Sequence, residues 1–389
     1  MILNNMARAG SGEPLSISIA DGRITRVAAT LPAESGNGPQ LTFVDAMVLP
    51  GLINSHDHLD FNLFPQLGNR TYSNYTEWGP YIQQAFADEI ASVMRIPFLL
   101  RERWGLYKNL LCGVTTVVNH SHIPAAGNDL ISVYEKCQTL HSVKFEPRWK
   151  KRLNNPFRVN QAVAIHVGEG TDAKAQREID ELIKWNLLRR KLVGIHGVSM
   201  SPRQAAHFKA LVWCPQSNHF LLNATARVKD LKKHTRILFG TDSTLTSGWN
   251  IWEHIRTARQ TGMLTDEELF QSFTTNPART WKLNTGQIGE GFDADLVIAK
   301  TNSANNMDAF YQLNPDDILL VIHKGNIRLF DEMLYHQLTG TNVINFGKIF
   351  TGNSFKYVQG DVAGLIKEIK QYKTDAAFPV HIPFEPAPE

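Results

Sequence analysis

Two imidazoles stand two residues apart at the end of an apolar run, an arrangement that can bind one metal ion. His56 and His58 follow the segment 48–53, Val-Leu-Pro-Gly-Leu-Ile. On a β-strand, side chains at positions i and i+2 point to the same face of the sheet. The pair is a weak signal alone, because 14 histidines in 389 residues give about half of one such spacing by chance, and His120 and His122 form a second pair.

Ligand-type side chains also follow other strand-like runs. His166 ends one apolar run, and Asp242 ends another much later in the chain. Three imidazoles and one carboxylate suit Zn²⁺ or Fe²⁺ and leave a coordination position for water. We therefore predict that His56, His58, His166 and Asp242 bind one divalent metal ion per chain.

Residues beside these ligands have the chemistry for proton transfer and substrate polarisation. A divalent ion lowers the pKa of a bound water towards about 7, which makes hydroxide available at neutral pH. Asp242 can accept the water proton, and Glu169, three residues past His166, can carry it to a leaving group. His196 ends a further strand-like run and can polarise the atom under attack. Any one of these residues alone is more often structural, and the prediction depends on their joint placement at four strand ends.

Strand-like and helix-like segments alternate from residue 42 to about 285 and would position these residues. The strands are expected at 48–55, 113–119, 143–149, 162–167, 192–198, 212–215 and 236–240, and the helices at 78–111, 128–140, 172–188, 202–211, 224–233 and 251–260. This alternation predicts an α/β fold with a parallel sheet, closed as a (β/α)8 TIM-like barrel over residues 50–285. The count gives seven strands. Residues 120–160 are too few for two strand–helix units, so either one unit is degenerate or a piece is missing from the sequence.

Both ends of the chain have a β texture. Residues 15–20 and 23–28 flank Asp21-Gly22, a strong hairpin signal, and residues 294–298 and 318–323 are apolar runs. We expect residues 1–49 and 286–389 to form a small discontinuous β-sandwich domain. Residues 361–373 are expected to add a helical tail capped by Asp361.

The composition is that of an ordinary soluble globular protein, with 43% hydrophobic and 20% charged residues. The net charge of +3 is spread along the chain, so no basic arm indicates a nucleic-acid partner. No run reaches the roughly 18 apolar residues of a membrane span, and no signal peptide is evident. Three widely spaced cysteines fit reduced thiols. We expect a cytoplasmic protein whose partner is a small-molecule substrate. A homodimer is one possible oligomeric state.

Eight short segments carry a resemblance to a known family and occur in that family's order. They are residues 50–58, 113–118, 166–169, 194–198, 214–218, 239–242, 275–279 and 291–297. On these segments the chain resembles the amidohydrolase superfamily, specifically its mononuclear deaminase and chlorohydrolase branch, which includes cytosine, guanine and triazine-acting enzymes. The resemblance implies the same four metal ligands, Glu169 as the proton shuttle and His196 as a residue that acts on substrate or water.

Substrate contacts are less specific. The resemblance places Ser217 and Asn218 near the pocket, and the aromatic loop of residues 61–77 and its exit are expected to shape it or to pack on the first helix. The candidate substrate-binding residues are Gln66, Trp78, His120, Ser217, Asn218 and His219.

Three features depart from the family pattern. Asp57 is an unusual acidic residue between the two histidines, and the pair His120 and His122 could touch substrate, bind another ion or be structural. Lys144 could be read as the carbamylated bridging lysine of binuclear relatives. The sequence from His166 to Glu169 favours the mononuclear type instead.

These observations predict a metal-dependent amidohydrolase that acts on C–N bonds other than peptide bonds. The leading hypothesis is hydrolytic deamination of an amino-substituted nitrogen heterocycle, by hydroxide on the metal. One alternative is hydrolysis of a cyclic amide or amidine bond, as in imidazolone-ring opening, and another is a non-catalytic scaffold on the same fold.

Overall fold

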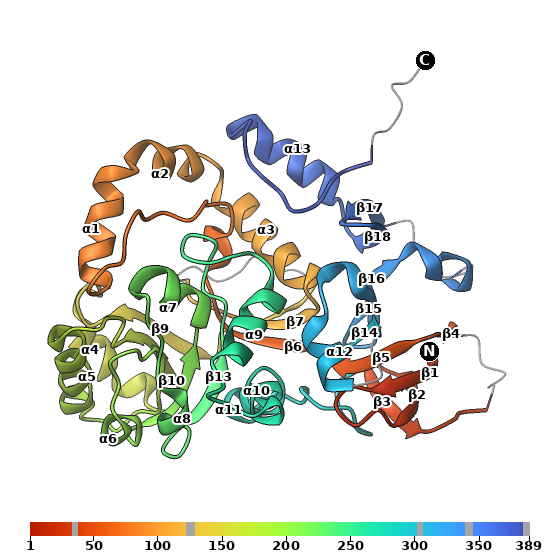
Figure 1. Cartoon of the computed structure of the whole chain (residues 1–389), viewed down its shortest axis with the longest axis horizontal. Coiled ribbons are helices and arrows are strands. Elements are labelled where there is room, and N and C mark those ends of the chain that lie inside the picture. Colours follow the sequence, from red (N-terminus) through yellow and green to blue (C-terminus); the bar gives the residue numbers. More distant parts are fainter. Residues whose placement is uncertain (33–37, 122–128, 302–305, 339–344, 384–389) are drawn as a thin grey trace.

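Strands and helices from the middle of the chain pack beside a sheet that both chain ends build (Figure 1). The computed structural model describes residues 1–32, 38–121, 129–301, 306–338 and 345–383. His122, one of the histidines noted in the sequence, lies outside the described residues.

Two parallel sheets carry the middle of the chain. One contains β6 (Leu52–Asp57), β7 (Val114–Asn119) and β8 (Ser132–Val133). The other contains β9 (Cys137–Ser142), β10 (Ala162–Val167), β11 (Leu192–His196), β12 (Phe208–Trp213) and β13 (Arg236–Phe239). A parallel bridge between Asp57 and Asp242 joins the end of β6 to the segment after β13. Because the strands run parallel, their carboxyl ends gather at one edge, where the predicted ligands lie.

The α/β prediction is correct, and closure of the barrel stays a prediction. Among the described residues, no ladder pairs β8 with β9. The short region after residue 120 also differs from expectation. The predicted helix 128–140 is wrong over its described part, because β8 and β9 occupy it, and burial alternates along β9 with the period of a strand. The predicted strand 143–149 is wrong too, since β9 ends at Ser142 and a helix begins at Trp149.

The helices flank these sheets. They are α1 (Tyr75–Ala85), α2 (Ala87–Met94), α3 (Phe98–Leu111), α4 (Trp149–Leu153), α5 (Ala173–Trp185), α6 (Pro202–Ala205), α7 (Pro215–Leu222), α8 (Val228–Leu231), α9 (Ile251–Gln260), α10 (Asp266–Ser272), α11 (Thr275–Trp281), α12 (Asn306–Gln312) and α13 (Val362–Tyr372). Short 3₁₀ helices occur at η1 (Leu59–Phe61), η2 (Pro156–Arg158), η3 (Pro315–Asp317) and η4 (Glu332–Leu338).

Three further helix predictions need correction. The expected helix 224–233 is reduced to α8, which spans only Val228–Leu231. The expected helix 78–111 is divided into α1, α2 and α3, because Phe86 departs from helical geometry and Pro97 caps α3 with an extended ψ of 138°. The expected helix 202–211 stops at Ala205, because Phe208 already begins β12. The strand 162–167 and the helix 251–260 are confirmed to the residue.

The ends of the chain share one sheet of ten strands. Its members are β1 (Ile2–Arg8), β2 (Pro14–Ala20), β3 (Arg23–Ala28), β4 (Gln40–Thr42), β5 (Ala46–Pro50), β14 (Leu296–Lys300), β15 (Ile318–His323), β16 (Asn326–Asp331), β17 (Phe346–Thr351) and β18 (Ser354–Gln359). The antiparallel pair of β5 and β14 joins the two ends. The hairpin of β2 and β3 and the Asp361 cap of α13 are confirmed. A sandwich of two sheets and the domain boundaries stay predictions.

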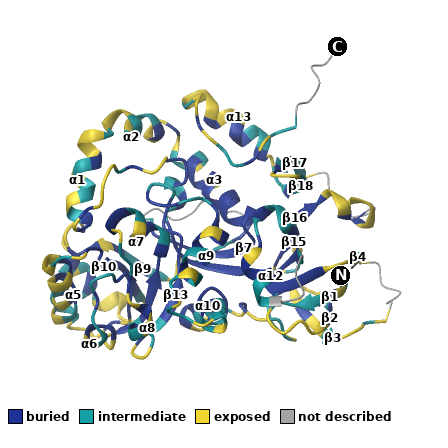
Figure 2. Ribbon diagram, in the orientation of Figure 1, coloured by how far each residue is buried: buried dark blue, intermediate teal, exposed yellow. Residues whose placement is uncertain are grey.

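The core runs through the central strands. Every residue of β6 and β7 is buried, whereas α1, α2 and α5 expose one side (Figure 2). The polar strand ends therefore lie inside the molecule, where unpaired polar groups are costly. Within the described part of the chain, no helix combines the length and apolar character needed to cross a membrane.

Candidate active site

The end of β6 brings His56 against the segment that follows β13. The backbone amides of Thr241 and Asp242 both donate to the His56 carbonyl, at 3.1 Å each. Gly240 permits this approach, because a Cβ atom there would lie 2.8 Å from the Cβ of His56. Two predicted ligands more than 180 residues apart in sequence are thus held by direct backbone contact.

Four histidine rings cluster around this contact. The ring centroid of His56 lies 4.9 Å from those of His58 and His166, and 5.9 Å from that of His196. The Nε2 atoms of His56 and His166 are 3.1 Å apart. Oδ1 of Asp242 lies 3.6 Å from Nε2 of His56 and 3.6 Å from Nε2 of His58. The structure therefore brings all four predicted ligands together.

Carbonyl oxygens fix the orientation of two of these rings. Nδ1 of His166 donates to the His141 carbonyl at 2.7 Å, and Nδ1 of His196 donates to Oδ1 of Asn218 at 2.8 Å. Because a carbonyl oxygen only accepts hydrogen bonds, each Nδ1 carries the proton and each Nε2 keeps its lone pair. Such second contacts are typical of metal-binding histidines.

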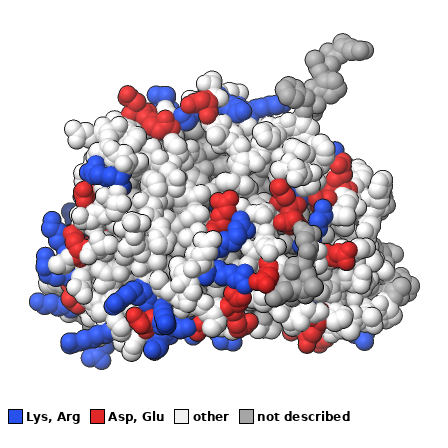
Figure 3. Space-filling model, in the orientation of Figure 1, with Lys and Arg blue, Asp and Glu red and all other residues white. Residues whose placement is uncertain are grey.

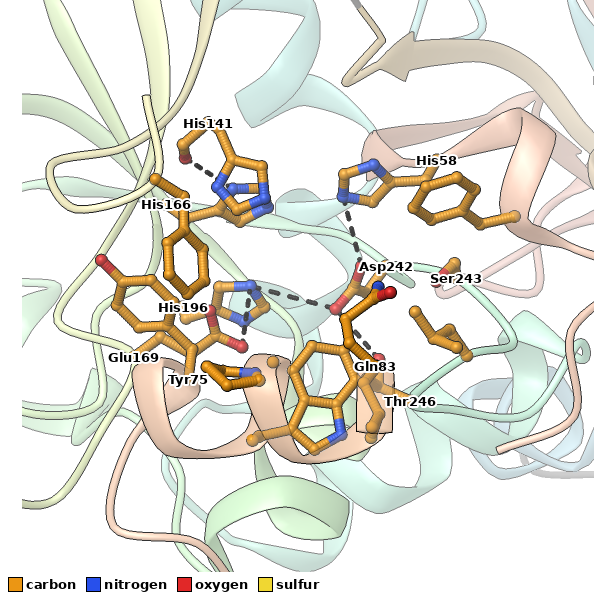
Figure 4. A pocket seen from close by; sticks show the side chains of 17 residues that line it. His58, Tyr75, Gln83, His141, His166, Glu169, His196, Asp242, Ser243 and Thr246 are labelled. Carbon is orange, nitrogen blue, oxygen red and sulfur yellow. Dashed lines mark hydrogen bonds and ion pairs between the residues drawn. The ribbon is translucent and has the colours of Figure 1, made fainter. Parts of the chain in front are cut away.

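Nε2 of His196 is buried and has no hydrogen-bond partner. It lies 3.7 Å from Oε1 of Glu169 and 3.9 Å from Oδ2 of Asp242 (Figure 4). A buried polar atom without a partner is costly, so an atom of this kind in a site indicates a missing ligand. The observation supports a bound ion, water or substrate between these three side chains.

Hydroxyl groups hold the carboxylate of Asp242. Its Oδ2 accepts from Ser217 Oγ at 2.7 Å and from Thr246 Oγ1 at 3.1 Å, which leaves Oδ1 towards the histidines. Asp242 and His196 both have left-handed backbone, with φ of 61° and 70°. Non-glycine residues adopt this conformation rarely, and such strain clusters at functional sites.

Burial sets the charges of the cluster. Burial lowers the pKa of His56 and, more strongly, that of His166, and it lowers the pKa of His58 to about 3. Burial alone would raise the pKa of Asp242, but the hydrogen bond and charge of His56, with the other histidines, hold that pKa well below its usual range. Burial raises the pKa of Glu169 to about 7. At neutral pH, neutral imidazoles thus surround an ionised carboxylate, and these are the protonation states that bind a metal.

These groups face a cavity of about 480 Å³ (Figure 4). It is lined by His58, Phe61, Tyr75, Trp78, Gly79, Pro80, Ile82, Gln83, His141, Phe145, His166, Glu169, His196, Asp242, Ser243, Leu245 and Thr246. Helix α1 forms one wall and is tied to the site, because the amide of Tyr75 donates to the Glu169 carbonyl at 3.0 Å.

The aromatic loop contributes to the cavity as expected, through Phe61 and the exit residues Tyr75 and Trp78. Sequence reasoning missed nine lining residues, among them Gln83, His141 and Phe145. His141 and Phe145 belong to the region whose elements were predicted wrongly. Correct placement of β9 would have put His141 near a strand end and indicated it.

The candidate substrate contacts other than Trp78 do not line the cavity. Ser217 and Asn218 are buried under the site, where they hold Asp242 and His196. Gln66 and His219 are exposed and are not among the lining residues. His120 is buried beside His56 and His166, behind the lining.

Asp57, the unusual residue between the two histidines, points the other way. It is fully buried, and its Oδ2 lies 3.0 Å from Nζ of Lys108 and 2.9 Å from Nδ2 of Asn109. Nδ2 of Asn62 donates to Oδ1 at 2.7 Å, and Oγ1 of Thr241 donates to Oδ2 at 3.3 Å. This network ties β6 to α3 and to the residue before Asp242.

Lys144 does not reach the cluster. Its side chain is 51% exposed and lies 3.8 Å from a carboxylate oxygen of Glu181, in a neighbouring cavity. The structure therefore does not place it as a bridging metal ligand.

Two triads have ligand atoms that all lie within 4.8 Å of one another. One is His56, His196 and Asp242, and the other is His56, His120 and His166. His56 belongs to both, and His58 joins the cluster through Asp242. The arrangement can hold one divalent cation beside Glu169, at the wall of the cavity.

Comparison with known proteins found relatives of this chain. Residues 157–328 match the model of the Amidohydrolase family. A 5-methylthioadenosine/S-adenosylhomocysteine deaminase of Caldicellulosiruptor saccharolyticus is 27% identical over 237 residues, which cover 53% of this chain and 55% of that protein. The chain spans about half the length of the curated relatives that it matches at 27% identity.

Solved structures show the fold. An adenosine deaminase of Xanthomonas campestris with bound zinc has a TM-score of 0.68 at 15% identity, over 96% of this chain and 97% of that chain. Guanine deaminase of C. acetobutylicum with bound guanine has a TM-score of 0.64 at 16% identity, over 84% of this chain and 99% of that chain. The chain therefore shares the fold of these proteins.

Proposed function

We propose that the chain is a metal-dependent hydrolase that removes an amino group from a nitrogen heterocycle. The match of residues 157–328 to the Amidohydrolase family supports a hydrolase. The observation that carries the proposal is the buried, unpartnered Nε2 of His196, which faces Glu169 and Asp242 across the cavity. The names of the curated relatives support deamination as the reaction.

The residues present fit a single divalent ion. We assign His56, His58, His166 and Asp242 as its ligands, because neutral imidazoles and one carboxylate suit zinc or ferrous iron. The 3.1 Å distance between the Nε2 atoms of His56 and His166 supports this assignment, because it places two possible ligand atoms side by side. When bound, the ion supplies hydroxide at neutral pH by lowering the pKa of a coordinated water.

Glu169 is assigned as the proton carrier. Its pKa of about 7 matches the best value for a group that must accept and release a proton near neutral pH. Helix α1 holds its backbone through Tyr75, and its carboxylate faces the cavity. Glu169 would take the proton from water and pass it to the departing amine.

His196 and Asp242 complete the site. Asn218 keeps the proton of His196 on Nδ1, so Nε2 meets the substrate or water as an acceptor in this state. Asp242 keeps Oδ1 free for the ligand side because Ser217 and Thr246 occupy Oδ2. The aromatic walls formed by Tyr75 and Trp78 suit a planar ring.

The domain division that accompanies this function is also proposed. Residues 50–285 would form the (β/α)8 catalytic barrel, and residues 1–49 and 286–389 would form the smaller β domain. The pairing of β5 with β14 supports this division, because it joins the two ends outside the parallel strands.

The experiment is a screen of the full chain, loaded with zinc or iron, against heterocycles that carry an amino group. 5-Methylthioadenosine and S-adenosylhomocysteine come first, because relatives are named for them, followed by aminopurines, pyrimidines, pterins and triazines. Release of ammonia with the ring intact is the expected result. Ring opening without ammonia would replace deamination by cyclic amide hydrolysis, and a metal-free, inactive chain would favour a scaffold.

A further inference from the structure

His120 is a buried imidazole that the proposed reaction does not use. It directly follows β7, and its backbone amide donates to the Asp57 carbonyl at 2.8 Å, which sets it level with the histidines at the end of β6. Its ring centroid lies 4.4 Å from that of His166 and 5.1 Å from that of His56. The end of β7 thus adds an imidazole to the layer of predicted ligands.

A backbone carbonyl fixes the proton of His120. Its Nε2 lies 3.1 Å from the Leu140 carbonyl, which only accepts, so Nε2 donates and Nδ1 keeps the lone pair. The same kind of contact orients His166, whose Nδ1 donates to the His141 carbonyl. Metal-binding histidines typically have this second contact, which fixes the ring and leaves the other nitrogen for the ion.

The distances fit a shared ion. Ligand atoms of His56, His120 and His166 all lie within 4.8 Å of one another, and two of them are 3.1 Å apart. Nitrogens bound to one tetrahedral zinc ion at 2.0–2.1 Å lie about 3.4 Å apart. Shifts of up to about 0.7 Å in each of these side chains would therefore close a coordination shell around one cation.

We propose that His120 is a direct ligand of the divalent ion, in an all-imidazole position that it forms with His56 and His166. This inference rests on the proposed function, because it concerns the same metal centre. Both triads contain His56, and one nitrogen atom binds one ion at a time. The two triads would therefore bind the same ion, with His120 and Asp242 in one metal centre. His120 is buried and is not among the residues that line the cavity, which favours a ligand over a substrate contact.

The chemistry of this position is specific. Three neutral imidazoles suit zinc, copper, cobalt or ferrous ions and disfavour magnesium or calcium, which prefer oxygen ligands. In the single centre, these imidazoles would outnumber the one carboxylate of Asp242. The centre would therefore select borderline ions such as Zn²⁺ and Co²⁺.

The test uses the full chain loaded with zinc, in wild type and in two variants, His120→Ala and His120→Gln. The Gln side chain can still donate to the Leu140 carbonyl but offers no imidazole lone pair. His254→Gln is the matched control, because His254 is also a buried imidazole held by a backbone carbonyl, that of Gly248, and it belongs to neither triad. X-ray absorption at the zinc edge counts imidazoles per ion, and competition with a chelator gives zinc affinity.

Both His120 variants are expected to show one imidazole fewer per ion than wild type and at least a tenfold weaker zinc affinity, while His254→Gln keeps both values. An unchanged imidazole count and affinity in the folded His120→Gln protein would overturn the inference and leave the proposed function standing. A wild-type protein that binds no zinc, iron or cobalt would overturn both. If His120→Ala fails to fold, the Gln variant decides.

Discussion

The two sides of the end of β6 contain buried polar groups of opposite character. On one side, His56 and His58 meet other imidazoles and Asp242, with 3.1 Å between the Nε2 atoms of His56 and His166 and 3.6 Å from Oδ1 of Asp242 to Nε2 of His56 and of His58. On the other side, Asp57 accepts hydrogen bonds on both carboxylate oxygens and pairs with Lys108. Three consecutive residues thus contribute to two different environments, because side chains alternate along a strand.

The two clusters differ in whether every buried polar atom has a hydrogen-bond partner. A cluster whose groups all have partners, like that of Asp57, is a structural element that fixes one backbone arrangement. A cluster with an unpartnered atom such as Nε2 of His196 is complete only when a ligand arrives. Substitutions in the histidine cluster should therefore remove metal and activity, whereas substitutions in the Asp57 network should lower the free energy of unfolding.

His56→Ala should have the largest effect on function. His56 belongs to both triads, so its removal leaves neither ligand set intact. We expect loss of bound metal, measured by elemental analysis after dialysis, and loss of activity. The exposed His207 provides a control in His207→Ala, which should keep both. Full metal content in the His56 variant would show that the ion binds elsewhere.

Glu169→Gln should separate metal binding from catalysis. The amide cannot carry the proton, so turnover should fall by about 10²–10⁴, the usual contribution of a general acid or base. Metal content should stay at the wild-type level, because Glu169 is not assigned as a ligand. The melting temperature of the metal-free protein should stay the same or rise, since a buried carboxyl is replaced by a neutral group. Loss of metal would mean that its role is misassigned.

Lys108→Met should act on the other side of the strand. It leaves the Asp57 carboxylate buried without its cation, and breaking a buried pair in this way costs about 3–5 kcal/mol of unfolding free energy. Urea denaturation measures the loss. The double variant Asp57→Asn/Lys108→Met should recover part of it, because no charge stays buried alone. A single variant as stable as wild type would contradict the structural role of the network.

Lys144→Ala should have the smallest effect. The side chain is half exposed and its ion pair with Glu181 is long, so unfolding free energy should change by less than about 0.5 kcal/mol. Metal content should not change. A drop in metal stoichiometry would restore the bridging lysine of a binuclear centre.

Fold elements with a local signal were predicted well. The alternation of β-branched residues marks strand 162–167, and the amphipathic period marks helix 251–260. The sequence around β8 and β9 lacks such a signal, because β8 has two residues and β9 contains polar residues on both sides. Prediction failed there, and His141 was missed with it.

The candidate site was predictable to the extent that strand ends converge. His56 and His166 lie one residue before the ends of β6 and β10, and Asp242 follows β13. Parallel strands bring such residues to one edge. The partners of Asp57 and His120 were not predictable, because Lys108 and Leu140 approach them only through tertiary packing.

The distribution of charge on the surface does not indicate the position of the site. Basic and acidic side chains are interspersed on the face in Figure 3, with basic ones gathered at its lower left.

The most direct test of the metal centre is anomalous X-ray diffraction at the zinc or iron edge, from crystals of the full chain loaded with that metal. We predict one strong peak within coordination distance of His56, in contact with imidazoles from β6 and β10 and with the carboxylate of Asp242. A loaded crystal with no peak at this position, or with the metal bound only at the protein surface, would contradict a metal centre formed by these residues.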